Sequence, residues 1–256
     1  MGTGTLSKSG GWDALTAIGV IAALPREARS LTREPLPPGK CTRLTNGLLV
    51  TVAGVGAERA LAAGEHLLAN GARALVSWGA AGALDRSLAP GDLLLPQRVL
   101  GTDGEVFAVN RLWHTRLRRM LRPRLKVHTG LLAQSPCLVS SAREKQALRL
   151  RSRALAVDME SAAIGRLARE AGVPFLVIRA VTDTAGMDIP ASVGRAVDDA
   201  GRVRLLRLLR GAMLHPADLA ALLHLGRNFR AAHTTLAALA ADTVPRLLPP
   251  RPDESA

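Results

Sequence analysis

A nearly unbroken apolar run fills residues 175–181 and is ended by Thr182 and Asp183. Its length and continuous hydrophobicity are typical of a strand that is buried on both faces of a parallel sheet. Ahead of it, apolar residues recur at helical spacing at positions 162, 163, 164 and 167, and Gly172 and Pro174 end that helix. A helix leading into a buried strand predicts an α/β fold, in which ligands bind beyond the carboxyl ends of the strands.

Other apolar runs predict the remaining elements. We predict strands within residues 14–24, 48–53 and 74–78, short strands at 93–95, 99–100 and 106–108, and a strand pair within 127–140. Asn46-Gly47 is a hairpin signal. Helices are predicted at 58–69, at 142–150 and from about residue 192 onward. The alternation of strands and helices places the chain in the α/β class.

Length and composition agree with one soluble domain. With 256 residues, 48% of them hydrophobic, we expect a domain at residues 17–240 between a flexible N-terminus (1–16) and a flexible Pro-rich C-terminus (241–256). Cys41 and Cys137 offer neither a disulfide framework nor metal-ligand spacing, so no metal is expected. Residues 14–24 resemble a signal-peptide core, but Pro25-Arg26-Glu27 is a poor cleavage context, which favours the cytoplasm.

Positive charge is concentrated in two segments. The formal net charge is +13, and from Arg111 to Lys126 there are seven basic residues and no acidic one. That segment and the one from Arg202 to Arg210 have apolar residues at helical spacing, which suits peripheral contact with an anionic inner membrane. The alternative is that these helices pack on the sheet. Because only 2% of residues are aromatic, a nucleic-acid partner is not expected.

Three segments carry a family resemblance. They are Ile18-Gly-Val-Ile-Ala-Ala-Leu-Pro-Arg-Glu27; Ser77-Trp-Gly-Ala-Ala-Gly-Ala-Leu-Asp85 with Pro90-Gly-Asp-Leu-Leu-Leu95; and Asp158-Met-Glu-Ser-Ala-Ala163 with Val177-Ile-Arg-Ala-Val-Thr-Asp183. Together they resemble the purine nucleoside phosphorylase and methylthioadenosine/S-adenosylhomocysteine nucleosidase superfamily over roughly residues 17–185. The resemblance implies a single α/β domain with a mixed, twisted central sheet flanked by helices, and a homodimer.

The same resemblance implies cleavage of a purine N-glycosidic bond. Asp183 would act as the general acid at the purine N7, and its apolar lead-in favours a protonated carboxyl group. Its alternative role is a simple cap of the following turn. Glu160 would accept the ribose hydroxyl groups, with Met159 packed beside the sugar. Asp158 is expected to be structural, as a cap or an ion-pair partner.

The attacking group depends on the loop after the first strand. In the hydrolytic branch of the family a glutamate there activates water, and Glu27 falls at that position. Its alternative role is a surface glutamate that begins a helix. Phosphorolysis instead needs an anion site, for which Arg26 and Arg29 are the candidates. Water is favoured, because Ser77-Trp-Gly-Ala80 lacks the arginine and the hydroxyl group of the phosphorolytic branch.

Base and backbone contacts are expected from a further set of residues. Glycine permits close approach of the backbone to a ligand, although a purely structural turn is the alternative for the two glycines of the set. The set is Gly79, Ala80, Gly82, Leu138, Val139 and Thr182. Gly54 and Gly56 lack the third glycine of a dinucleotide fingerprint, so we expect no cofactor.

Departures from the family point to the substrate. The stretch Ser135-Pro-Cys-Leu-Val139 has no aromatic residue to stack on the base, and the segment after Gly101 is short and basic. These features resemble the hopanoid-associated phosphorylases, which remove adenine from adenosylhopane. The alternatives are a methylthioadenosine/S-adenosylhomocysteine nucleosidase and a non-catalytic nucleoside- or lipid-binding protein.

Overall fold

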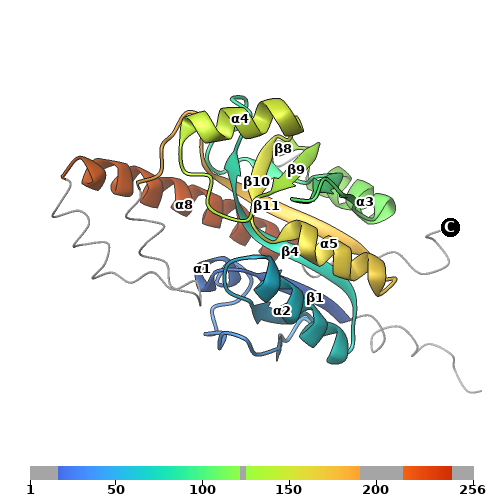
Figure 1. Cartoon of the computed structure of the whole chain (residues 1–256). Helices are drawn as coiled ribbons and strands as arrows, with labels where there is room; N and C mark the ends of the chain where they lie inside the picture. Colours follow the sequence, from blue (N-terminus) through green and yellow to red (C-terminus); the bar gives the residue numbers. More distant parts are fainter. Residues whose placement is uncertain (1–16, 122–124, 191–215, 244–256) are drawn as a thin grey trace, which may run out of the picture.

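The computed structural model describes residues 17–121, 125–190 and 216–243. The predictions for residues 1–16, for the segment from Arg202 to Arg210 and for the Pro-rich residues 244–256 lie outside the described residues. Within the described ranges the chain forms one α/β domain, in which helices cover a central twisted sheet (Figure 1). The predicted fold class is confirmed.

Most predicted elements form close to their expected positions. The strands are β1 (Ala17–Ala22), β2 (Thr42–Arg43), β3 (Leu49–Val52), β4 (Ala72–Ala83), β5 (Leu93–Leu94), β6 (Arg98–Leu100), β7 (Val106–Ala108), β8 (Val127–His128), β9 (Leu131–Gln134), β10 (Ala156–Asp158) and β11 (Phe175–Asp183). The helices are α1 (Pro25–Ala28), α2 (Ala57–Ala69), α3 (Arg111–Leu121), α4 (Ala142–Ser152), α5 (Ser161–Glu170) and α8 (Pro216–Thr243).

The long strand β4 is the centre of the sheet. It pairs in parallel with β1 and β11, and its last residues pair in antiparallel fashion with β10. The main path runs β2-β3-β1-β4-β10-β9-β6-β7, while β11 continues through β5 to β8. The strands β8 and β9 do not form the expected pair, because β8 joins β5 and β9 joins β10 and β6. The sheet is therefore mixed, with its parallel strands in the middle.

Helices cover the sheet because each turns an apolar stripe toward it. α5 and α2 contact each other and both pack on β4, and they lie side by side in Figure 1. α8 packs along β11 and against α1, and passes behind the central strands in the same view. All nine residues of β11 are buried, as its unbroken apolar run predicts. The parallel strands thus bring their carboxyl ends to one edge, between α1 and α5.

The basic helix α3 uses its apolar side inside the molecule. Trp113, Leu117 and Leu121 are buried in the main core, whereas Leu112 and Met120 are partly exposed. The expectation that this apolar face lies on a membrane is therefore wrong for α3, and the packing alternative holds. Among the described residues, no helix is long and apolar enough to cross a bilayer.

Candidate active site

Four carboxylates from three parts of the sequence meet at the carboxyl ends of the central strands. Glu27 follows β1, Asp158 and Glu160 end and follow β10, and Asp183 ends β11 beside Gly82 of β4. Each of the four is only 4–6% exposed. Buried carboxylates need partners that offset the loss of hydration, so their surroundings indicate what each one can do.

Arg179 is the partner of the first three carboxylates. This arginine of β11 is 1% exposed, and its Nη2 lies 2.7 Å from Asp158 Oδ2 and 3.9 Å from Glu160 Oε2. Its guanidinium also donates to Ser77 Oγ at 2.7 Å. Burial lowers the pKa of Arg179, but the charges of Asp158, Glu160 and Glu27 outweigh burial and raise it. One fixed cation therefore faces three carboxylates, which leaves the group with excess negative charge.

Glu27 is held by backbone donors on two sides. Its Oε1 accepts a hydrogen bond from the Ala80 amide at 2.7 Å, and its Oε2 accepts one from the Leu24 amide at 2.9 Å. Burial raises the pKa of Glu27, against the lowering effect of Arg179 and of the backbone donors. Glu27 does begin a short helix, but it is not a surface residue. A buried carboxylate with a raised pKa is suited to take a proton from water.

The carboxyl group of Glu160 has a pKa far above its ordinary value. Burial and the neighbouring charge of Asp158 raise its pKa to about 7, while Arg179 and the Gly56 amide act in the opposite direction. The Gly56 amide donates to Glu160 Oε1 at 2.9 Å. The loop at Gly54 and Gly56 therefore supports a site carboxylate. Met159, beside it in sequence, is half-buried.

Asp158 has the expected structural role. It accepts hydrogen bonds from the amide and the hydroxyl group of Ser161, the first residue of α5, and it forms the closest ion pair with Arg179. The carboxylate thus ties the start of α5 to β11. This contact sets the position of Glu160, which lies between Asp158 and the helix.

Asp183 is not surrounded by apolar groups alone. Lys145 of α4 places its Nζ 2.5 Å from Asp183 Oδ2, and this lysine is fully buried. Thr182 donates its hydroxyl group to Asp183 Oδ1 at 2.9 Å, so Thr182 supports the acid. Despite the short distance, Oδ2 has no hydrogen bond of favourable geometry. The sequence predicted apolar surroundings for Asp183, and the structure adds a cation from α4.

The two glycines of β4 make room for site side chains. A Cβ atom at Gly79 would collide with the Glu27 carboxylate and with Arg179. A Cβ atom at Gly82 would lie 2.9 Å from Asp183 Oδ2. Both approaches are closer than van der Waals contact between non-bonded atoms allows. Glycine at these positions lets the charged groups converge on β4. This crowding explains the two glycines without the expected approach of a ligand to the backbone.

The expected base-contact segment lies beside the chain that follows Asp183. Ser140, next to Val139, accepts a hydrogen bond from the Ile189 amide at 2.7 Å. Leu138 is 42% exposed, whereas Val139 packs on a small second core cluster. The segment therefore leads into a contact with the chain six residues beyond Asp183 and leaves Leu138 exposed.

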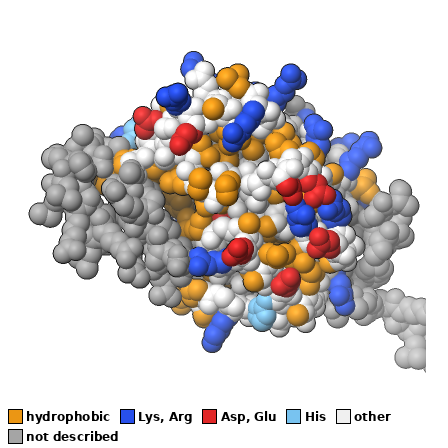
Figure 2. Space-filling model, in the orientation of Figure 1, with side chains coloured by type: hydrophobic (Ala, Val, Ile, Leu, Met, Phe, Trp, Pro, Cys, Tyr) orange, Lys and Arg blue, Asp and Glu red, His pale blue; other side chains and the backbone are white. Residues whose placement is uncertain are grey.

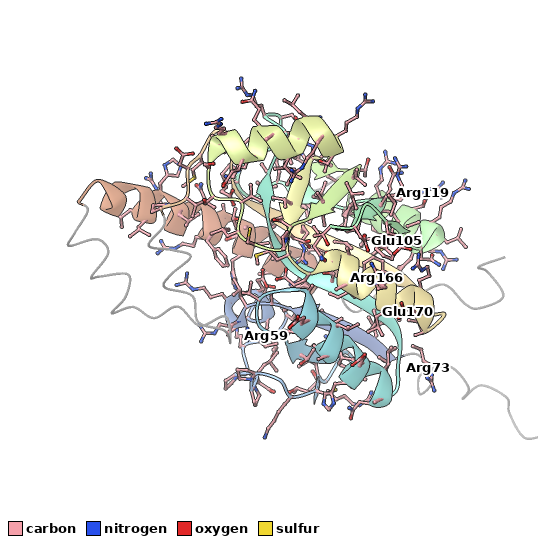
Figure 3. All side chains as sticks on the ribbon, viewed as in Figure 1. Arg59, Arg73, Glu105, Arg119, Arg166 and Glu170 are labelled. Atoms are coloured by element: carbon pink, nitrogen blue, oxygen red, sulfur yellow. The ribbon has the colours of Figure 1, made fainter. Side chains whose placement is uncertain are left out.

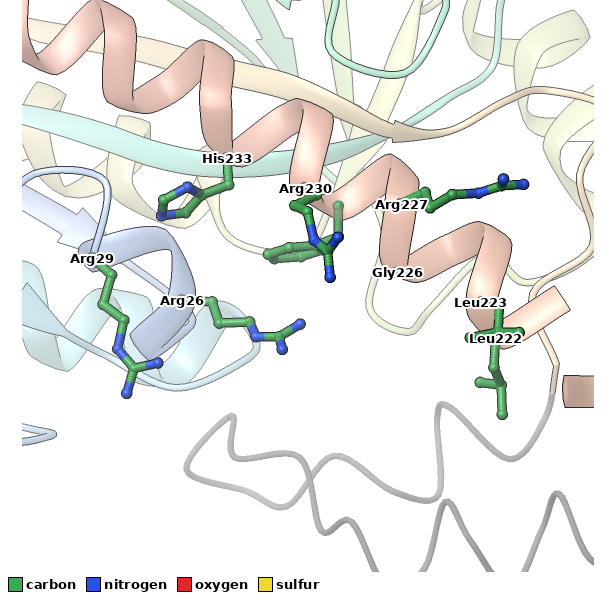
Figure 4. Close-up of a pocket in the computed structure, with 9 residues that line it drawn as sticks. Arg26, Arg29, Leu222, Leu223, Gly226, Arg227, Arg230 and His233 are labelled. Carbon is green, nitrogen blue, oxygen red and sulfur yellow. The ribbon is translucent and has the colours of Figure 1, made fainter. Parts of the chain in front are cut away.

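Arg26 and Arg29 face a separate cavity of about 770 Å³ between α1 and α8 (Figure 4). The Arg26 guanidinium lies 5.7 Å from the centre of the Phe229 ring. The described lining residues include none of the four carboxylates. They are Arg26, Arg29, Leu222, Leu223, Gly226, Arg227, Phe229, Arg230 and His233. The two arginines thus line this cavity together with residues of α8.

Ion pairs on the outer side of α5 contrast with the buried group. Arg166, which is 41% exposed, lies 3.3 Å from Glu105, and both are labelled in Figure 3. Arg169 pairs with the same glutamate at 2.5 Å. In Figure 2, hydrophobic side chains occupy much of the middle of this face, and many Lys and Arg side chains stand around it. Exposed pairs of this kind stabilise a protein by at most about 1 kcal/mol.

Sequence reasoning missed two residues of the site. Arg179 had a visible signal, because an arginine inside a buried strand requires a carboxylate partner. Lys145 had no such signal, since α4 is a charged helix with no apolar stripe that could show which side is buried. Its burial follows only from how α4 docks beside β11.

Comparison with known proteins adds a family match and several similar enzymes. The model of the phosphorylase superfamily matches residues 17–210. A 5′-methylthioadenosine/S-adenosylhomocysteine nucleosidase of Staphylococcus aureus is 27% identical over 198 residues, 66% of this chain and 86% of that enzyme. The Staphylococcus epidermidis enzyme is 27% identical over 144 residues, 49% of this chain. That match spans 63% of the length of the relative.

Solved structures share the fold at lower identity. The Neisseria meningitidis nucleosidase in complex with methylthio-immucillin-A superposes with a TM-score of 0.67 at 20% identity, over 89% of this chain and 98% of that one. Futalosine hydrolase of Helicobacter pylori gives a TM-score of 0.65 at 18% identity, over the same shares of the two chains.

Proposed function

The chain belongs to the phosphorylase superfamily, and on that premise we propose that it cleaves the N-glycosidic bond of a 5′-modified adenosine and releases adenine. The observation that carries the proposal is the convergence of Glu27, Glu160 and Asp183 at one end of the sheet. A non-catalytic binding protein would have no need to bury these carboxylates around two cations, Arg179 and Lys145. The resembling nucleosidases provide the reaction class.

Each carboxylate has a step in the proposed reaction. Asp183 gives a proton to the purine N7 while the N9–C1′ bond breaks and its electron pair passes to the purine. The carboxylate of Glu160 accepts the ribose hydroxyl groups, and the excess negative charge of the group favours the positive ribosyl centre. Glu27 takes a proton from the water that attacks C1′. The products are adenine and the free 5′-modified sugar.

Water is favoured over phosphate by the charges around Glu27. The Nε and Nη2 atoms of Arg179 already donate to Asp158, Ser77 and Ser161. A phosphate next to Glu27 and Glu160 would meet like charge. Arg26 and Arg29 line the cavity beside α8 instead. Hydrolysis is thus our first candidate, and phosphorolysis with these two arginines is the alternative.

For the natural substrate we propose adenosylhopane, with methylthioadenosine or S-adenosylhomocysteine as the alternative. The exposed Leu138, in the expected base-contact segment, suits a substrate with a bulky apolar 5′ group. A cytoplasmic location and a homodimer are part of this proposal. The homodimer rests on the family resemblance, and peripheral contact with the inner membrane rests on the basic segment at residues 202–210.

An adenine-release assay tests the proposal. Adenosylhopane in detergent, methylthioadenosine and S-adenosylhomocysteine are each incubated with the enzyme, with and without phosphate, and adenine and sugar products are measured. We expect release without phosphate, to give the free sugar. Formation of a sugar 1-phosphate would assign phosphorolysis. If none of the three substrates yielded adenine under either condition, glycosidic cleavage would be rejected and a binding role preferred.

The activity should fall on the acid side of neutrality. Since the pKa of Glu160 is raised to about 7, the carboxylate that accepts the ribose hydroxyl groups becomes scarce below that pH. We expect kcat/KM to decrease about tenfold per pH unit below the inflection, because kcat/KM reports ionisations of the free enzyme. A pH–rate profile from pH 5 to 9 measures this. Glu160→Gln should be far slower and should lose this inflection.

The raised pKa of Glu160 also affects stability, and it favours the folded state at acid pH, where activity is expected to fall. In the unfolded chain Glu160 has its ordinary pKa of 4.5, so between pH 4.5 and about 7 the folded state binds the proton more tightly. The contribution of this group is fully present below pH 4.5 and is lost as the pH rises through about 7. Urea unfolding at pH 5.5 and pH 8 should therefore show that Glu160→Gln is more stabilised, relative to the wild type, at pH 8.

A further inference from the structure

Lys145 is a fully buried lysine that takes part in none of the steps of the proposed reaction. It comes from the first turn of α4, while the acid that it contacts comes from the end of β11. Burying an ammonium group costs several kcal/mol unless its charge and its hydrogen bonds are satisfied. A lysine with 0% exposure at this point therefore calls for an explanation.

The ammonium group has three partners. Its Nζ donates to the backbone carbonyls of Thr184 at 3.0 Å and Met187 at 2.8 Å, and it lies 2.5 Å from Asp183 Oδ2. An ammonium has three N–H donors and no acceptor, so this set is suited to the charged form. The cation is thereby directed at one oxygen of the acid from the side of α4.

The start of α4 is fixed to the chain that follows Asp183. The Ala142 amide donates to Asp188 Oδ1 at 2.7 Å, and the Ile189 amide donates to the Ser140 carbonyl at 2.7 Å. Ser141 caps the helix by accepting a hydrogen bond from the Glu144 amide. These contacts hold the first turn of α4 in register with residues 184–189. Lys145 therefore has little freedom to leave Asp183.

Other charged groups around Lys145 have partners of their own. Glu144 turns back to the amides of Ser140 and Ser141, and Arg149 forms an ion pair with Asp85 at 2.5 Å. Asp188 is occupied by the Ala142 amide. Across from Lys145, β11 contributes Asp183 as the ionisable group in contact. The pairing is thus specific to these two side chains.

We infer that Lys145 is a positioning residue that offsets the negative charge developing on Asp183 during proton transfer, an inference that rests on the proposed function. When Asp183 gives its proton to N7, its carboxyl group becomes a carboxylate 2.5 Å from a fixed ammonium. No proton leaves Lys145 in this step. A preorganised cation at a site where charge develops lowers the barrier without any reorganisation of its own. Lys145 would therefore lower the barrier to departure of adenine and have little effect on nucleoside binding.

The test compares Lys145→Met and Lys145→Gln with the wild type. Methionine keeps the unbranched shape and most of the length of the side chain without its charge, and glutamine keeps donors for the Thr184 and Met187 carbonyls. With the 5′-modified adenosine that the wild type cleaves best, we expect both variants to lower kcat by about 100-fold with little change in KM. A 4-nitrophenyl riboside, whose leaving group departs without a proton, should be cleaved by all three proteins at similar rates.

The possible results distinguish a role of Lys145 in proton transfer from a purely structural role. A wild type that releases no adenine rejects the proposed function and with it this inference. If the wild type is active and the variants keep its kcat, Lys145 has no part in the reaction. If KM rises in parallel with the fall in kcat, or if the nitrophenyl substrate is slowed as much as the adenosine, the lysine only maintains the structure. Loss of rate in Lys145→Met but not in Lys145→Gln would assign the effect to the two carbonyl contacts.

Discussion

Asp183→Asn is expected to lower the rate of adenine release by about 10²- to 10⁴-fold, the range in which general acids contribute. Asparagine has nearly the same shape as aspartate but offers no acidic proton for N7. The variant should also be less stable, because Lys145 would remain buried without its carboxylate at 2.5 Å. Removing one partner of a buried ion pair costs about 3–5 kcal/mol. Adenine release and urea unfolding measure the two effects.

A double variant separates these two effects. Adding Lys145→Met to Asp183→Asn removes the unpaired cation, so stability should recover most of the loss while activity stays low. Lys145→Met alone should also be destabilised, since the Thr184 and Met187 carbonyls lose their donor. If Asp183→Asn kept the rate of the wild type, Asp183 could not be the acid. If the double variant were no more stable than Asp183→Asn, the ion pair would not be the cause of the instability.

Arg179→Met is expected to cause the largest loss of stability in the molecule. The variant leaves Asp158, Glu160 and Glu27 buried without the cation that all three face. The loss should be at least about 3–5 kcal/mol at pH 8, the cost of breaking one buried pair. It should be smaller at pH 5, because carboxylates without a cation keep their protons to higher pH. A carboxyl group whose pKa is raised in the folded state stabilises the fold below its unfolded pKa. This stabilisation is lost as the pH rises through the folded pKa.

Urea unfolding at pH 5 and pH 8 measures this prediction, with Arg166→Met as the matched control. Arg166 also pairs with carboxylates, Asp103 and Glu105, but it is 41% exposed. Its loss should change stability by about 1 kcal/mol or less at either pH. If Arg179→Met were as mild as the control, the carboxylates would not depend on Arg179. Adenine release should be lost in Arg179→Met and kept in Arg166→Met.

The elements of the site could be predicted because their signals are local. The apolar run of β11, the helical spacing of α5 and the stop at Gly172 and Pro174 each follow from neighbouring residues. A strand that ends in Asp183 delivers that carboxylate to the ligand-binding edge of a parallel sheet. The same reasoning placed Glu27 after β1 and Glu160 at the start of α5.

Predictions that depended on a side chain's surroundings were less complete. The apolar stripe of α3 was correctly identified, but its spacing is the same for a helix on a membrane and for one on its own core. Gly79 and Gly82 were expected to contact a ligand, and the structure shows that the groups they accommodate belong to α1 and β11. Thr182 was expected at the base, which stays a prediction, and the structure adds its hydrogen bond to Asp183.

The sequence by itself determined the α/β class, the order of the elements and which carboxylates end the central strands, because hydrophobic periodicity and strand termini are properties of contiguous residues. Only the tertiary structure decided that Arg179 faces three of these carboxylates and that Lys145 stands behind the fourth. Those pairings join residues from α4, β10 and β11 that are distant along the chain. They depend on packing distances of a few ångströms, over which the charge of one group controls the chemistry of another.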